Sequence, residues 1–113
     1  MSIRRVISVT AALVIAVLTT ASMPDAVEAA AKKCLFISSY HQGYAHADQI
    51  EAGVRSTLKG HCDLRQFDMD TKRRSSAEDK KKSALAARAV IDSWKPDIVI
   101  TADDNAVKYL IEP

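Results

Sequence analysis

From residue 33 onward, short apolar runs alternate with longer segments of helical periodicity, and this alternation limits the folds open to the chain. Three runs have the length and composition of β-strands, at 34–39, 62–68 and 98–101. The first and third look buried on both faces, whereas the second alternates as a strand near a sheet edge does. Strands that alternate with helices form parallel sheets. The sequence therefore predicts a Rossmann-like α/β fold, with a parallel sheet flanked by helices in the order βαβαβα.

The two segments between these runs carry apolar residues at steps of three or four, which is one face of an amphipathic helix. We expect the first helix over residues 47–59. The second begins at Ser75, which with Glu78 forms a capping-box pattern, and it runs to about Trp94. Pro96 then ends it, because proline cannot continue a helix.

The first thirty residues have the anatomy of a secretory signal peptide rather than of a folded element. Two arginines precede an apolar run over 6–18, which is shorter than the roughly 20 residues of a membrane-spanning helix. Small residues fit cleavage after Ala29 or Ala31. We therefore predict a signal peptide over 1–29, Sec export to a bacterial periplasm and no membrane span after cleavage. The remaining 30–113 would form a single α/β unit.

Basic residues are concentrated in two runs, 71–74 and 80–82. Such runs can bind nucleic acid, but Glu78 and Asp79 lie between them and no aromatic residue interleaves. A solvated helix face explains them better, so no nucleic-acid partner is predicted.

Signatures of enzymes, cofactors and metals are missing. The sequence has no GxGxxG after the first strand, no GxxxxGK[ST] and no GxSxG. His41 and His46 lack the HExxH arrangement and a third ligand at a suitable spacing. We predict neither enzymatic activity nor a cofactor nor a bound metal.

Polar residues follow the first and third strands, where an open parallel sheet binds its ligands. The candidate ligand-binding residues are Tyr40, His41, Asp103, Asp104 and Asn105. Several have a structural alternative: Asn105 could cap a helix over 106–111, one aspartate could favour that helix's dipole, and Tyr40 could pack on the sheet edge.

Three stretches carry a resemblance to a known family: KCLFISSYHQGYA, RQFDMDTKRR and WKPDIVITADDNAVKYL. In order and spacing they resemble the start of periplasmic substrate-binding proteins of ABC transporters, in the ABC transporter substrate-binding protein family with the type I periplasmic fold. The resemblance covers residues 33–111. It implies a two-lobed receptor that closes on a small-molecule solute, such as an amino acid, and delivers it to a membrane permease without chemistry.

The resemblance also implies that the chain is truncated, since it ends inside the first lobe of such a receptor. The second lobe and half of the first sheet would be absent, which leaves a sheet edge unpaired. Two alternatives remain open: an extracytoplasmic sensory input domain, and a truncated remnant without function.

The two cysteines of the predicted mature part, Cys34 and Cys62, fit the same picture. In the strand order that the resemblance implies, both lie at the amino-terminal starts of neighbouring strands. Export to an oxidising compartment would allow them to pair. The bond would contribute on the order of 3 kcal/mol in the chain-entropy model.

Overall fold

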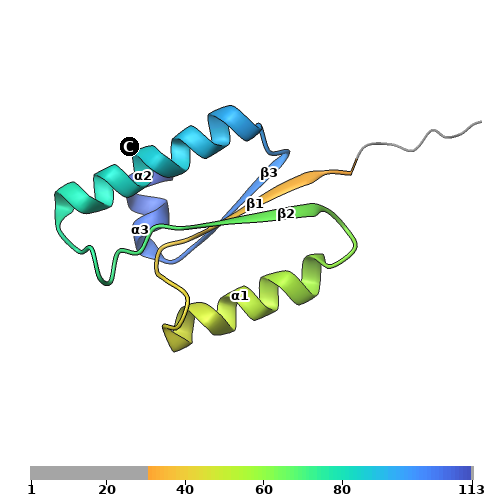
Figure 1. The fold of residues 1–113 in the computed structure, drawn as a ribbon, viewed down its shortest axis with the longest axis horizontal. Coiled ribbons are helices and arrows are strands. Elements are labelled where there is room, and N and C mark those ends of the chain that lie inside the picture. Colours follow the sequence, from red (N-terminus) through yellow and green to blue (C-terminus); the bar gives the residue numbers. More distant parts are fainter. Residues whose placement is uncertain (1–30, 113) are drawn as a thin grey trace, which may run out of the picture. The chain divides into compact units, whose positions relative to one another are not determined.

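The computed structural model describes residues 31–112, and within them the predicted alternation of strands and helices is confirmed (Figure 1). The predicted signal peptide lies outside these residues. The elements are, in chain order, β1 (Lys33–Ser38), α1 (Ala45–Leu58), β2 (Asp63–Asp68), α2 (Ala77–Trp94), β3 (Ile98–Ala102), α3 (Asp104–Ala106) and η2 (Val107–Ile111). The last of these, η2, is a π-helical segment that continues directly from α3.

The three strands form one sheet in the order β2-β1-β3, and both strand pairs are parallel. Cys34 lies opposite Leu64 on one side and Ile98 on the other. The chain therefore leaves β1 toward one side of the sheet and returns to the other, so the strand order reverses between β1 and β3. As Figure 1 shows, α1 covers one face of the sheet, and α2 and α3 cover the opposite face.

Because β1 is central, its side chains are buried on both faces of the sheet. Leu35 and Ile37 point toward α2 and the last helical segment, where they join the main core cluster. Its buried members are Leu35, Ile37, Met69, Ala84, Ala87, Ala106 and Leu110. Small alanines on the inward face of α2 let that helix lie close to the sheet, as its sequence suggests.

The start of α2 differs from the sequence prediction by one residue. Ser76, rather than Ser75, is the N-cap, and its Oγ accepts a hydrogen bond from the backbone N–H of Asp79 at 3.0 Å. The predicted pairing of Ser75 with Glu78 is therefore wrong, because the adjacent serine occupies the extended cap conformation. The helix ends at Trp94 as predicted, followed by Lys95 in the left-handed conformation.

The amino-terminal end of the sheet is closed by a disulfide between Cys34 and Cys62, which confirms the predicted pairing. Their Cα atoms are 6.0 Å apart, within the usual range for a disulfide. The neighbouring backbone is also paired. Lys33 donates its N–H to Asp97 Oδ2 at 2.8 Å and accepts from the N–H of Asp97 at 2.9 Å.

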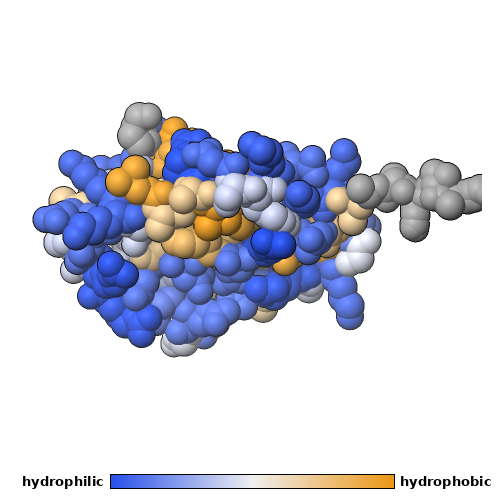
Figure 2. Space-filling model, turned by 45° about the horizontal axis from the view of Figure 1, so that its top comes forward, coloured by the Kyte–Doolittle hydropathy of each residue, from blue (hydrophilic) through white to orange (hydrophobic). Residues whose placement is uncertain are grey.

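No helix within residues 31–112 is long and apolar enough to cross a membrane. The surface is largely hydrophilic on the face shown in Figure 2, with an apolar area among the charged residues. Four large apolar side chains are exposed in the described part of the chain: Leu85, Ile98, Val107 and Ile111.

Candidate functional site

The loops that follow the three strands meet at the carboxyl-terminal end of the sheet. We call this region the carboxyl-end rim, and define it as residues 39–46, 69–74 and 103–105. Ser39 of the first loop is bonded to the end of β3 and to the second loop: it donates its N–H to Ala102 O at 3.1 Å and accepts at its carbonyl from the N–H of Thr71 at 3.0 Å. Parallel strands bring their carboxyl ends to one edge, and here backbone hydrogen bonds fix the loops to each other.

A buried serine connects the first loop to the start of α3. Ser39 is completely buried; its Oγ donates to Ala102 O at 2.7 Å and accepts from the backbone N–H of Ala106 at 2.8 Å. The Ser39 hydroxyl thus accepts from a backbone N–H at the start of α3 that has no partner within this short helix.

Asn105 lies inside the first turn of α3 and does not cap it, so the interpretation of Asn105 as an N-cap over 106–111 is wrong. Its side-chain amide instead donates to Thr71 Oγ1 at 2.9 Å. Thr71 Oγ1 in turn donates to the carbonyl of Ser39 at 2.5 Å. The Asn105 amide therefore holds the second loop against the third. A cap from Asn105 is not needed, because Ser39 Oγ already accepts from the backbone N–H of Ala106.

Asp103 has an unusual backbone conformation between β3 and α3. Its φ of 72° and ψ of 169° lie in a region that residues other than glycine rarely enter, at a cost of roughly 1–3 kcal/mol. The carboxylate Oδ1 lies 3.0 Å from His46 Nε2 at the start of α1. Its Oδ2 is buried and has no hydrogen-bond partner within residues 31–112. The strained backbone thus places an unsatisfied acceptor at the rim.

Tyr40 and Tyr44 form an aromatic pair in the first loop. Their rings meet edge to face with centroids 5.3 Å apart, and both side chains are half-buried. The ammonium of Lys72, from the second loop, lies 5.0 Å from the ring centroid of Tyr40 and 5.1 Å from that of Tyr44. Burial raises the pKa of Tyr40, and the negative charge of Asp103 raises it further.

His41 points toward the second loop rather than toward the aspartates of the third. Its Nδ1 lies 3.4 Å from Asp70 Oδ1, within ion-pair distance but outside the geometry of a hydrogen bond. Arg73 binds the same carboxylate in a bidentate manner, at 2.7 and 3.0 Å. This hydrogen bonding holds the pKa of Asp70 below its ordinary value.

The five residues predicted from the sequence therefore have different surroundings. Asp103 raises the pKa of Tyr40, whereas Asn105 bonds to Thr71 and His41 is engaged with Asp70. Asp104 is exposed in the first turn of α3, and its charge, like that of Asp103, raises the pKa of Tyr40. Within residues 31–112, no group of three His, Cys, Asp or Glu side chains is placed to hold a metal ion.

Sequence reasoning missed the rim residues of the second loop and two residues of the first. The missed residues are Ser39, Tyr44, Asp70, Thr71 and Lys72. Topology offered a signal for the second loop, since every strand of a parallel sheet ends at the same edge. The interpretation of the basic run 71–74 as a solvated helix face is wrong, because α2 begins only at Ala77 and Thr71 is buried in the loop before it.

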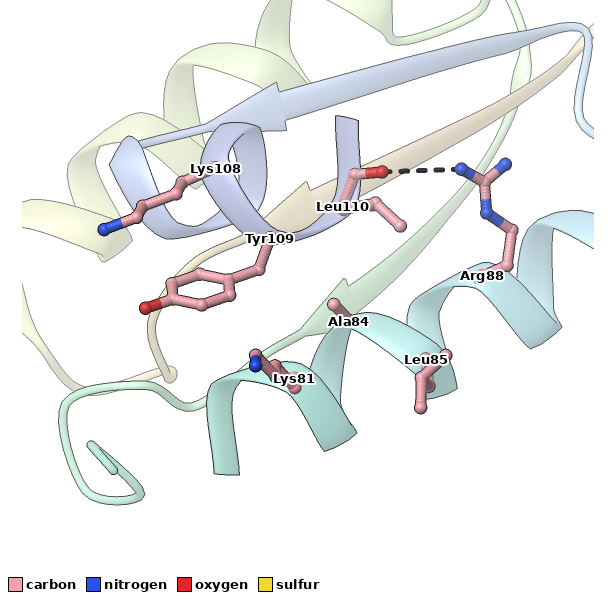
Figure 3. A pocket seen from close by; sticks show the side chains of 7 residues that line it. All are labelled: Lys81, Ala84, Leu85, Arg88, Lys108, Tyr109 and Leu110. Atoms are coloured by element: carbon pink, nitrogen blue, oxygen red, sulfur yellow. Dashed lines mark hydrogen bonds between the residues drawn. The ribbon is translucent and has the colours of Figure 1, made fainter. Parts of the chain in front are cut away.

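A separate hollow of about 600 Å³ lies between α2 and η2, away from the rim (Figure 3). Ala84 of α2 points toward Tyr109 and Leu110 of η2, Leu85 lies at the margin, and Arg88 donates to Leu110 O at 3.4 Å. It shares no residue with the rim. This hollow is apolar with basic margins, whereas the rim combines aromatic rings, carboxylates and an amide.

No protein-family model, no curated protein and no solved structure was found to match this chain.

Proposed function

We propose that the chain is the solute-binding component of an ABC-type importer, or the first part of its amino-terminal lobe, and that it captures a small molecule in the periplasm without chemistry. The observation that carries this proposal is that Tyr40, Asp103 and Asn105 all follow strands at the carboxyl end of one parallel sheet, where Asp103 acts on Tyr40 and Asn105 is bonded to the second loop. Open parallel sheets bind their ligands there, at the point where the strand order reverses. In this sheet the reversal lies between β1 and β3.

The chemistry of the rim suits a binding protein better than an enzyme. It offers aromatic rings for apolar contact, together with carboxylates and an amide for polar recognition. Its tyrosines and histidines are engaged with Lys72 and with carboxylates, and the described residues contain no paired nucleophile and base. Such a set of groups can orient a solute and release it unchanged.

The covalent link at the opposite end of the sheet is consistent with export. Disulfides persist in oxidising compartments such as the bacterial periplasm and are rare in the cytosol. The Cys34–Cys62 bond thus supports periplasmic localisation, together with the leader-like composition of residues 1–29.

Under this proposal the rim forms one wall of a binding cleft, and a second lobe supplies the other wall. The partners are the solute and the membrane permease that receives it. A single wall contacts only part of a ligand, so the affinity of this unit alone is expected to be well below that of a closed two-lobed receptor.

The proposal can be tested by solute uptake in the source organism. A strain that lacks the coding sequence should take up one class of small solute more slowly, and the wild-type sequence should restore uptake. Asp103→Asn should restore it poorly, because the substitution removes the charge at the rim. Asp92→Asn, at an exposed position of α2, is the matched control and should restore uptake fully.

Equal uptake of all solutes by the deleted and the restored strains would contradict the proposal. Circular dichroism melting of both variants separates a loss of binding from a loss of folding.

A further inference from the structure

The aromatic pair of the rim is already occupied by a cation from the same chain. The Lys72 ammonium lies within 5.1 Å of both ring centroids, inside the roughly 6 Å range of a cation–π interaction. The two rings are held edge to face at an angle of 82°, so one cation can contact both. The geometry of Tyr40 and Tyr44 thus fits a positively charged group.

The Lys72 side chain can move away from the two tyrosine rings, although the backbone beside it is fixed. The preceding residue, Thr71, is buried and bonded to Ser39 through both its N–H and its hydroxyl. Lys72 itself is exposed. Because an exposed cation–π contact contributes only about 0.5–1 kcal/mol, a ligand can displace the ammonium at a small cost.

The charges beside Tyr40 indicate which ligand would replace it. Asp103 and Asp104 are both close enough to raise the pKa of Tyr40, and Lys72 opposes them. Once Lys72 moves away, the charges that act on the Tyr40 hydroxyl are those of the two carboxylates. The Oδ2 of Asp103 is buried and has no partner in the described residues, so this carboxylate has unused capacity to accept a hydrogen bond.

We propose that the rim selects a solute with a primary ammonium on an apolar body, and that Lys72 is an internal competitor for the same place. This inference rests on the proposed function, whose solute class it specifies. The ligand's ammonium replaces that of Lys72 over Tyr40 and Tyr44 and donates to Asp103. A zwitterion is disfavoured, because its carboxylate would lie near Asp103 and Asp104 while Arg73 is already engaged by Asp70.

The test uses the protein produced from all 113 residues and three matched probes: 2-phenylethylamine, 2-phenylethanol and L-phenylalanine. Amide NMR spectra should show that the amine shifts the resonances of the rim, that the alcohol does not, and that phenylalanine binds more weakly than the amine. In Lys72→Met, loss of the competitor should tighten amine binding about threefold, since this corresponds to one exposed cation–π contact.

Two further variants test whether amine binding takes place at the rim. Asp103→Asn should weaken amine binding, whereas Lys59→Met, an exposed lysine just after α1, should leave it unchanged. The inference is overturned if the amine shifts no rim resonance in either the wild type or Lys72→Met. It is also overturned if the alcohol or phenylalanine binds as well as the amine, or if Lys72→Met weakens binding.

Failure of this inference can be distinguished from failure of the proposed function. If uptake depends on Asp103 but the transported solute is neutral, zwitterionic or anionic, then the importer function stands and the selection of an amine is wrong. If the amine binds at the rim but no uptake depends on the protein, then the selectivity stands and the transport function is wrong.

Discussion

At the amino-terminal end of the sheet a disulfide joins β1 to the start of β2, whereas at the carboxyl-terminal end the same strands are joined by hydrogen bonds through Ser39 and Thr71. At the amino-terminal end, the backbone N–H and carbonyl of Lys33 both form hydrogen bonds with Asp97. The second end retains the strained backbone of Asp103 and an acceptor without a partner.

The contrast fits the proposed function, under which the amino-terminal end contributes mainly stability and the carboxyl-terminal end also serves recognition. A covalent link at one end can offset unfavourable conformations at the other, because the free energy of folding is a property of the whole unit. Strain and unsatisfied groups persist where the surrounding structure fixes them, and they are common at binding sites. Substitutions at the amino-terminal end should therefore destabilise, whereas those at the carboxyl-terminal end should have either sign, depending on whether they remove a hydrogen bond or relieve strain.

The largest effect is expected at the disulfide. Replacing both Cys34 and Cys62 by serine should lower the free energy of unfolding by about 3 kcal/mol, because the unfolded chain regains the entropy of an open loop. Urea unfolding measures the change, and the wild type in reductant should show a similar loss. A loss below about 1 kcal/mol would show that the amino-terminal end does not have the stabilising role assigned to it.

At the carboxyl-terminal end the largest loss is expected from Ser39→Ala. The substitution leaves the backbone N–H of Ala106 buried without its partner, which should cost about 2 kcal/mol. Ser93→Ala is the matched control, since Ser93 is exposed and its hydroxyl makes only a 3.4 Å bond to Val90 O. If the two variants unfold at the same urea concentration, Ser39 does not hold the rim together.

Asp103→Gly should have the opposite sign. Glycine adopts the φ of 72° without steric strain, so stability should rise by about 1 kcal/mol while solute binding falls. Asp104→Gly, one residue later inside α3, should instead destabilise by up to about 1 kcal/mol. Thermal melting distinguishes the two signs, and a destabilised Asp103→Gly would refute the claim that Asp103 is strained.

The smallest effect concerns Asp70 and Arg73. Because Arg73 holds the pKa of Asp70 below its ordinary value, Arg73→Met should raise that pKa. A lowered pKa in the folded state stabilises the protein above the ordinary pKa, and this contribution is lost as the pH falls through the lowered value. The stability difference between wild type and variant should therefore vanish in acid, and carboxyl NMR titration measures the pKa itself. An Asp70 pKa that does not change in the variant would contradict the assignment.

The fold was predictable because local pattern and topology agree. Apolar runs gave the three strands and helical periodicity gave α1 and α2, while the strand order that the resemblance implies placed Cys34 beside Cys62. The helix starts were less predictable. Ser75 and Ser76 both have capping side chains, and only the backbone conformation decides between them.

The site was predictable only in part, since its contacts join residues far apart in sequence. Topology brought Tyr40 and Asp103 to one edge of the sheet. However, Asn105 bonds to Thr71, 34 residues away, and the start of α3 is capped by Ser39, which lies 67 residues before Ala106. The conformation of Asp103 was not predictable either. Aspartate does enter positive φ, but mostly in the left-handed helical region, and the ψ of 169° lies outside that region.

The most direct test of the central claim, that the carboxyl-end rim is the binding edge, is hydrogen exchange measured by mass spectrometry. The protein would be compared in a small-molecule extract of its host cells and in the same extract after dialysis. We predict that the undialysed extract protects the loops 39–46, 69–74 and 103–105 and leaves α2 and η2 unchanged. Protection confined to the hollow between α2 and η2, or protection at no segment, would contradict the account.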